Sequence, residues 1–337
     1  MWSTAHELGE QLVRIAQQVR IAQQAAAPTP RLEAYDALGH LWFFRGYYAP
    51  AWTYLEQALA LIDPAAQQAQ ALQQGEASGV RCLTVAAATL WCLGYPTQAL
   101  RLSQEALAVA HALDHPQSLA VAHYWAALLH HRRRETTVVQ TQAKALLTLA
   151  TAQQLPLWVG HGTCWQGWGL AMRGQAERGL AQLHQGLATV LATGQTLSQP
   201  LHLVLVAEAL GCTGQRQEEG QRLVEALRAF EASGREDMHG EAYRLQGNLL
   251  LRLVPPDVVQ AETCFQQALT LARRQQAKSW ELRAAISLAR LWQRQVKHVE
   301  AHALLAPVYG WFTEGFDTAD LQEAKALLDE LGASNGC

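Results

Sequence analysis

Residues 38–59 have the sequence LGHLWFFRGYYAPAWTYLEQAL. Apolar residues recur every three or four positions on both sides of Gly46, which predicts two helices joined by a tight turn at that glycine. The small residues Gly39, Ala51 and Ala58 allow these helices to approach closely, while the bulky residues fill the space toward neighbouring units. The stretch therefore predicts a helical hairpin.

The same hairpin pattern recurs along the 337 residues. In the clearest copies a small residue stands five positions after the turn glycine, as Ala51 does after Gly46. Arg133 and Val296 occupy two turn positions where glycine is expected, and the small residue of the fifth copy is displaced to Gly220. The pattern predicts seven turns, at Gly46, Gly94, Arg133, Gly174, Gly214, Pro255–Pro256 and Val296.

The first copy fills every signature position of the tetratricopeptide repeat between Leu38 and Leu59. The sequence therefore predicts an all-α, right-handed superhelical solenoid of about seven tetratricopeptide-like hairpins with a C-terminal capping helix. Pro28 and Pro30 separate a leading helix from this array. The expected divisions are a leading helix at 1–27, the repeat solenoid at 32–312, a loop and capping helix at 313–331 and a frayed tail at 332–337.

The composition fits closely packed helices, because 50% of the residues are hydrophobic and only 16% are charged. A net charge of -3 provides no field that would select a nucleic acid or an anionic membrane. The six cysteines form no CxxC pair, so we expect reduced structural thiols that are mostly buried. Because a signal-peptide pattern and a membrane-length apolar run are both missing, we expect a cytoplasmic protein.

Three segments resemble the C-terminal repeat region of a family of bacterial multidomain signalling proteins. In this family an adenylate or guanylate cyclase domain and a P-loop ATPase of the predicted-ATPase type precede tetratricopeptide repeats. The resemblance implies a regulatory repeat region only, since the catalytic and nucleotide-binding residues of the family lie in domains that have no counterpart here. The segments are Leu93–Pro96, Phe265–Leu269 with Ala277–Arg283, and Leu304–Thr318.

Sequence motifs for catalysis are missing. There is no Gly-x4-Gly-Lys-[Ser/Thr] phosphate loop, no Gly-x-Ser-x-Gly elbow and no His-Glu-x-x-His pair. We therefore expect no enzymatic activity, no catalytic residue and no cofactor. The histidines of one region lack cysteine partners, so we expect interface and surface histidines and no metal site; these are His111, His115, His123, His130 and His131. The short basic run Arg132–Arg134 indicates a solvated turn, and we expect no nucleic-acid partner.

The first helix of each tetratricopeptide hairpin lines the concave face, so its inward positions predict a partner-binding groove. The groove would be aromatic and rich in histidine in its N-terminal half and rich in arginine in its C-terminal half. Its candidate residues are His40, Phe43, Phe44, Arg81, Trp91, His123, His130, His131, His161, Trp168, Arg244, Asn248, Arg283, Arg290 and Arg294. Alternatively, the aromatic residues fill gaps between adjacent hairpins.

Our first hypothesis is a non-catalytic scaffold for protein interaction and regulation, the sensing arm of a signalling ATPase or nucleotide cyclase. Its partner would be a protein or peptide in the groove, and an ATPase or cyclase domain of the same chain is the first candidate. The alternative is a solenoid that senses a small ligand, similar to some transcription activators. An enzyme with an unrecognised site is the third hypothesis.

Overall fold

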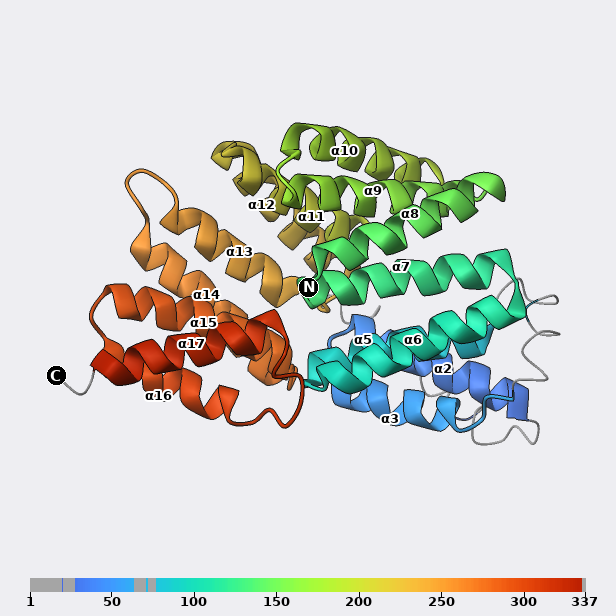
Figure 1. Ribbon diagram of the computed structural model, residues 1–337, viewed down its shortest axis with the longest axis horizontal. Coiled ribbons are helices and arrows are strands. Elements are labelled where there is room, and N and C mark those ends of the chain that lie inside the picture. Colours follow the sequence, from blue (N-terminus) through green and yellow to red (C-terminus); the bar gives the residue numbers. More distant parts are fainter. Residues whose placement is uncertain (1–19, 21–27, 64–70, 72–76, 335–337) are drawn as a thin grey trace, which may run out of the picture.

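The computed structural model describes residues 20, 28–63, 71 and 77–334, and all regular structure in these ranges is helical (Figure 1). The predicted leading helix at 1–27 lies almost wholly outside the described residues, as does most of the predicted tail. The helices are α2 (Pro28–Phe44), α3 (Tyr48–Leu59), α5 (Ser78–Leu93), α6 (Pro96–Leu113), α7 (Pro116–Arg132), α8 (Thr136–Ala152), α9 (Pro156–Met172), α10 (Ala176–Ala192), α11 (Gln199–Thr213), α12 (Arg216–Ser233), α13 (His239–Leu251), α14 (Val258–Arg274), α15 (Lys278–Arg294), α16 (His298–Tyr309) and α17 (Ala319–Ser334).

Consecutive helices pack in pairs, from α2 with α3 to α15 with α16, and α17 then packs on α15 and α16. The all-α repeat solenoid predicted from the sequence is confirmed. Each pair depends on close approach: a Cβ atom at Gly179 of α10 would lie 2.5 Å from the carbonyl oxygen of Gly167 in α9. No helix within the described ranges is both long and apolar enough to cross a membrane.

Left-handed residues form most of the predicted hairpin turns: Gly46, Gly94, Gly174, Gly214 and Val296 all have positive φ. The sixth turn, at Pro255–Pro256, has no residue with positive φ. In the third hairpin the left-handed residue is Arg134, with φ of 64°, whereas Arg133 is right-handed, so the predicted turn position was wrong by one residue. Side chains other than glycine pay a steric cost in this region, which packing on both sides must offset.

The two ends of the solenoid meet (Figure 1), a contact that the repeat pattern did not predict. The Ser279 hydroxyl at the start of α15 donates a hydrogen bond to the carbonyl oxygen of Trp91 in α5, at 2.5 Å. The Trp280 ring packs edge-on against the Trp91 ring, with 4.7 Å between centroids. Both indoles are buried. We call this contact between α15 and α5, together with the loop described next, the closure.

The loop between α16 and α17 completes the closure. The Glu314 carboxylate accepts hydrogen bonds from the backbone amides of Thr97 and Gln98, at 2.9 and 3.1 Å, and so caps the start of α6. Trp311 packs against Tyr95 of the second hairpin, with ring centroids 5.5 Å apart. Most of the segments that carry the family resemblance therefore meet at one place: Leu93–Pro96, the start of α15 and the loop before α17. Phe265–Leu269 lies within α14, outside the closure.

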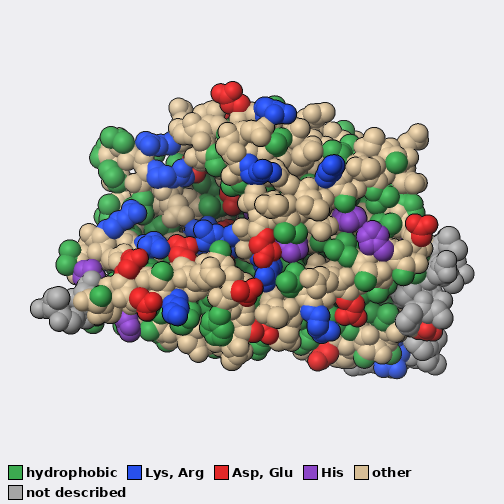
Figure 2. All heavy atoms as spheres, viewed as in Figure 1, with side chains coloured by type: hydrophobic (Ala, Val, Ile, Leu, Met, Phe, Trp, Pro, Cys, Tyr) green, Lys and Arg blue, Asp and Glu red, His purple; other side chains and the backbone are tan. Residues whose placement is uncertain are grey.

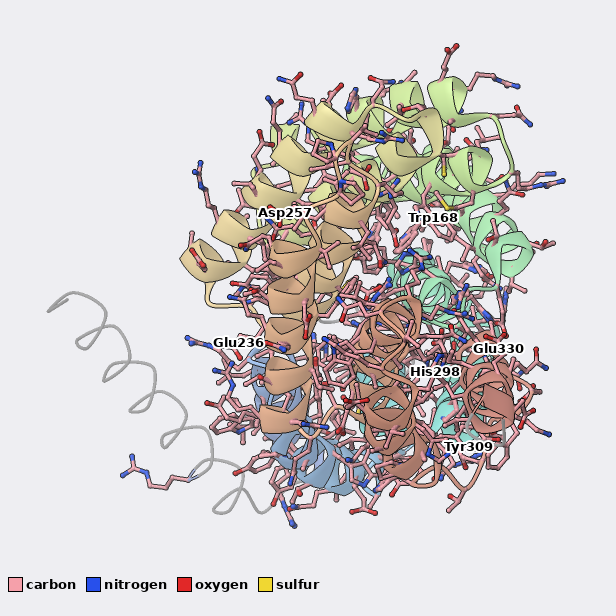
Figure 3. The ribbon with its side chains drawn as sticks, turned by 90° about the vertical axis from the view of Figure 1, so that its left-hand side faces the viewer. Trp168, Glu236, Asp257, His298, Tyr309 and Glu330 are labelled. Atoms are coloured by element: carbon pink, nitrogen blue, oxygen red, sulfur yellow. The ribbon has the colours of Figure 1, made fainter. Side chains whose placement is uncertain are left out.

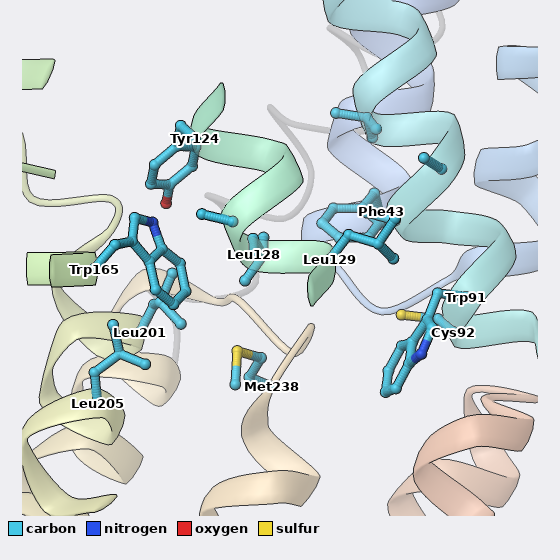
Figure 4. Close-up of a cluster of buried hydrophobic side chains, with 14 of the residues drawn as sticks. Phe43, Trp91, Cys92, Tyr124, Leu128, Leu129, Trp165, Leu201, Leu205 and Met238 are labelled. Atoms are coloured by element: carbon cyan, nitrogen blue, oxygen red, sulfur yellow. The ribbon is translucent and has the colours of Figure 1, made fainter. Parts of the chain in front are cut away.

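Arg132 lies inside the closure and is fully buried. Its guanidinium carbon is 5.5 to 5.7 Å from the ring centroids of Phe43, Trp91 and Trp280. Figure 4 shows Phe43 and Trp91 in this part of the core. Its nearest carboxylate is that of Asp237, at 3.8 Å. The expectation of a solvated basic turn was wrong for Arg132 and also for Arg133, which is 5% exposed. Trp280 of α15 packs on Arg132, and Arg133 donates a hydrogen bond to the carbonyl oxygen of Pro96 at the start of α6.

Buried histidines occupy a second part of the core. Nδ1 of His161 lies 3.2 Å from Nε2 of His202, and the aromatic ring of Tyr124 packs beside them. Burial lowers the pKa of His202 to about 3, and burial together with the nearby His202 lowers the pKa of His161 well below its usual value. Both imidazoles are therefore neutral in the folded protein. Of the cysteines predicted to be buried in helices, Cys212 is exposed.

The closure generates a first prediction, which compares two glycines with left-handed backbone. A Cβ at Gly315 (φ 75°) would lie 2.1 Å from Cγ of Pro96 across the closure, whereas a Cβ at Gly174 (φ 84°) would meet nothing within 4 Å. We expect Gly174→Ala to lower the free energy of unfolding by about 1 kcal/mol. Gly315→Ala should cost clearly more in urea unfolding. Equal losses would contradict a tight closure.

The buried histidines generate a second prediction. A histidine in the unfolded chain has a pKa of about 6.5. Below that pH the unfolded chain therefore takes up a proton at this residue, whereas folded His202 takes one up only near pH 3. Stability should therefore fall as the pH drops from about 6.5 toward 3. We expect His202→Gln to flatten this fall, by up to about 1.4 kcal/mol per pH unit, and the same change at exposed His184 to leave it intact. Urea unfolding at a series of pH values measures the stability of both variants. If stability falls equally steeply with decreasing pH in the two, the lowered pKa of His202 is contradicted.

Candidate functional site

A polar pocket of about 510 Å³ opens on the inner side of the solenoid, and we call it the central pocket. Helices that are far apart in the sequence form its walls: α7, α9 and α11 on one side and α13, α15 and α17 on the other. Figure 2 shows basic and acidic side chains gathered at the hollow. The lining residues are His131, Arg134, Thr136, Trp168, Met172, Glu208, Glu241, Arg244, Asn248, Leu251, Arg283, Ile286, Ser287, Arg290, Leu291, Arg294, Asp320 and Glu323.

Helical spacing explains why so many charged residues face this pocket. On α15, Arg283, Ser287, Arg290 and Arg294 follow one another at intervals of three or four residues, so they lie along one face of the helix. The lining residues of α13 repeat at the same intervals, from Glu241 to Leu251. The closure brings these two faces opposite α7 and α9.

The pocket collects seven of the fifteen residues predicted from the repeat positions. They come from four hairpins and include most of the predicted arginine-rich half. They are His131, Trp168, Arg244, Asn248, Arg283, Arg290 and Arg294. Three more residues at inward repeat positions also line the pocket: Met172, Glu208 and Glu241.

The other eight predicted residues lie outside this pocket. Phe43 and Trp91 are buried in the closure, and Phe44 lies beneath the guanidinium of Arg235, 4.4 Å from its ring centroid. The other five residues pair with nearby side chains: His40 and Arg81 with the Asp36 carboxylate, His123 with Gln142, His130 with Glu135 and His161 with His202. Later segments of the chain cover only part of the N-terminal inner face, where Trp280 packs on Trp91 and Arg235 lies over Phe44.

Glu241 anchors the deep end of the pocket. Its two carboxylate oxygens accept hydrogen bonds from Nη2 and Nε of Arg244, at 2.7 and 2.8 Å, and Nη1 of Arg283 lies 3.5 Å from one of them. Burial disfavours the charge on Glu241, but attraction to Arg244 and its hydrogen bonds, with Arg283, lower the pKa to about 2. The carboxylate is therefore charged at neutral pH and holds both arginines in place.

A second carboxylate orients the aromatic wall. Oε2 of Glu208 lies 2.9 Å from Nε2 of His131 and accepts a hydrogen bond from Nε1 of Trp168, at 2.8 Å. The imidazole packs against the Trp168 ring, with centroids 4.8 Å apart. Figure 3 shows Trp168 across from the C-terminal helices. These contacts fix the indole as a rigid surface.

Repeat positions alone did not identify three of the charged lining residues: Arg134, Asp320 and Glu323. Arg134 donates to both carboxylates, at 3.3 Å to Asp320 and 2.6 Å to Glu323, and thereby joins the third hairpin to α17. The only signal in the sequence was that two acidic residues, Asp320 and Glu323, stand three positions apart on the closing helix. Among the described residues, no group of three or more His, Cys, Asp or Glu side chains is placed to hold a metal ion.

Comparison with known proteins supports the fold. No family model and no curated protein matches the sequence. Aspartyl phosphate phosphatase F from Bacillus subtilis is similar in structure, with a TM-score of 0.52 and 12% identity over 83% of this chain and 70% of that one. A signal transduction ATPase with numerous domains and a tetratricopeptide repeat sensor, from Pyrococcus horikoshii, matches with a TM-score of 0.45 and 13% identity over 90% of this chain. This chain spans only 44% of the length of that ATPase. The similarity to the phosphatase therefore supports the all-helical fold of this chain.

The pocket generates a third prediction, which compares two Arg–Glu pairs spaced by three residues. Glu241 pairs with Arg244 in a buried setting, at 2.7 Å, whereas Glu225 pairs with Arg222 on the surface, at 2.8 Å. We expect Glu241→Gln to lower the free energy of unfolding by about 3 kcal/mol, because it leaves buried guanidinium groups without a counter-charge. Glu225→Gln should cost less than about 1 kcal/mol. Equal losses in chemical denaturation would contradict the anchoring role of Glu241.

Proposed function

We propose that this chain is a regulatory interaction scaffold without catalytic activity of its own. The observation that carries the proposal is the convergence of seven predicted inward residues on one polar pocket of a tetratricopeptide-like solenoid. Rigid, largely pre-paired charges suit recognition of a partner, since little side-chain ordering remains to be done on binding. Arginine and tryptophan are also the residues that contribute most at binding interfaces.

The finer proposal is that the chain is the sensing arm of a signalling ATPase or nucleotide cyclase. Its support is the sequence resemblance, most of whose segments form the closure. A partner segment seated at the mouth of the central pocket would contact the third, sixth and seventh hairpins together. It would thus favour the closed arrangement, and partner binding would be linked to the shape of the whole solenoid.

A second candidate function, sensing of a small ligand, is favoured by the volume of the pocket. About 510 Å³ falls in the range of small-molecule sites, which runs from roughly 300 to 1,000 Å³. The packing of Trp280 on Trp91 and of Arg235 on Phe44 also leaves less room on the N-terminal inner face for an extended protein partner. The two functions are compatible, because a ligand in the pocket and a protein at its mouth would occupy different depths.

Photo-crosslinking tests the first proposal. The photoreactive residue p-benzoylphenylalanine replaces Asn248 in the pocket or, as a control, exposed Gln221 on α12. After irradiation in the host cell, we expect a crosslinked protein at position 248 that is absent at position 221. An ATPase or cyclase domain in that product would support the sensing arm.

Other outcomes of this experiment are decisive as well. Crosslinking to an unrelated protein would support a scaffold and reject the sensing arm. The same products from both positions, or none at all, would contradict a partner at the central pocket. Native mass spectrometry of the protein purified from its host then tests the second candidate function through the presence or absence of a bound small molecule.

A further inference from the structure

Positive charge is in excess at the mouth of the central pocket. Arg134, Arg290 and Arg294 all reach the solvent there. The Glu323 carboxylate is shared by two of them, at 2.6 Å to Arg134 and 3.2 Å to Arg290. Arg294 makes no hydrogen bond and no ion pair within the part of the chain that the structure describes. Its guanidinium therefore has five donors without a partner among the described residues, on an exposed side chain that lines the pocket.

The deep carboxylates offset only part of this excess. Glu241 is already engaged by Arg244 and Arg283. Asp320 accepts from Nε of Arg283 at 2.8 Å and from Arg134 at 3.3 Å. Glu208 is engaged by His131 and Trp168. The lining as a whole has five arginines against four carboxylates, in a protein whose formal net charge is -3. The pocket is thus more positive than the rest of the protein.

The spacing of the two outer arginines favours a bound anion. Arg290 and Arg294 are four residues apart on α15, a distance at which like charges repel and destabilise a helix. An anionic group between the two guanidinium groups would remove this repulsion. Guanidinium groups hold carboxylate and phosphate oxygens through paired hydrogen bonds, which makes these the matching head groups.

Apolar side chains also line the pocket. Trp168 and Met172 of α9 face α15 across the pocket, Leu251 comes from α13, and Ile286 and Leu291 stand beside the arginines on α15 itself. The Trp168 indole is held by its hydrogen bond to Glu208, so its ring is a fixed surface. A flat apolar body would lie against it while the charged end meets the arginines.

We propose that the central pocket binds a small organic anion, with a carboxylate or phosphate group at Arg290 and Arg294 and an apolar body against Trp168 and Met172. The proposal rests on the second candidate function and names its ligand class. Ligand binding would bridge α9 to α15, which belong to the fourth and seventh hairpins, and so would stabilise the closed solenoid.

Titration calorimetry of the full chain with four probes tests the proposal. Phenyl phosphate and phenylacetate have the proposed head groups on an aromatic body, inorganic phosphate lacks the body, and benzylamine has the opposite charge. We expect the two aromatic anions to bind, the tighter one identifying the head group, and benzylamine not to bind. Phenyl phosphate should bind about tenfold more tightly than inorganic phosphate, since its ring is removed from water.

Variants locate the site. Arg294→Gln leaves the fold intact, because this side chain is exposed and makes no bond to a described residue, and it should weaken binding of the aromatic anions by about tenfold. Arg228→Gln makes the same charge change on an exposed face of α12 and should leave binding unchanged. Met172→Lys should shift affinity toward inorganic phosphate by replacing an apolar side chain of the pocket with a cation.

Four results would overturn the proposal: no binding of either aromatic anion, equal binding of benzylamine, equal binding of inorganic and phenyl phosphate, or unchanged affinity in Arg294→Gln. Failure of the proposal is separable from failure of the second candidate function. If the probes fail while native mass spectrometry shows a bound small molecule, the ligand class is wrong and the sensing function stands. If both fail, the pocket binds no small ligand.

Discussion

The edge-on packing of Trp280 against Trp91, with the guanidinium groups of Arg132 and Arg283 over the same two rings, joins the last hairpin to the second. The backbone also takes part, because Arg283 donates from Nη2 to the carbonyl oxygen of Arg132. Without this contact the inner faces of α7 and α15 would not lie opposite each other. The central pocket exists only because the closure brings them together.

Arg283 belongs to both the closure and the pocket. On one side its guanidinium lies over the Trp91 ring, 5.2 Å from the centroid, and on the other it pairs with Asp320 at 2.8 Å. A change in the charges around Glu241 and Asp320 would therefore alter the packing of Arg283 against the indoles of Trp91 and Trp280. Arg132, by contrast, is buried with its nearest carboxylate 3.8 Å away, so its charge is compensated mainly by aromatic faces and its neighbours must hold it in place.

The sequence predicted local features well and long-range contacts poorly. Hairpin turns at Gly46 and Gly174, and the inward faces of α13 and α15, follow from spacing along single helices, which the chain itself displays. The closure depends on the summed rotation of all the hairpins, and no single residue specifies that rotation. For this reason only the structure showed that Phe43 and Trp91 are buried. It also showed that Arg134 and Asp320 line the pocket and pair with each other.

An open solenoid can gain or lose a repeat with little effect on the others, since each unit contacts only its neighbours. Here Glu314 caps a helix that begins more than two hundred residues earlier in the chain. A duplicated or deleted hairpin would move that cap, together with Trp280, by the width of one repeat. During evolution the number of repeats in this protein is therefore constrained, and its diversification is expected through substitution at inward positions rather than through changes in length.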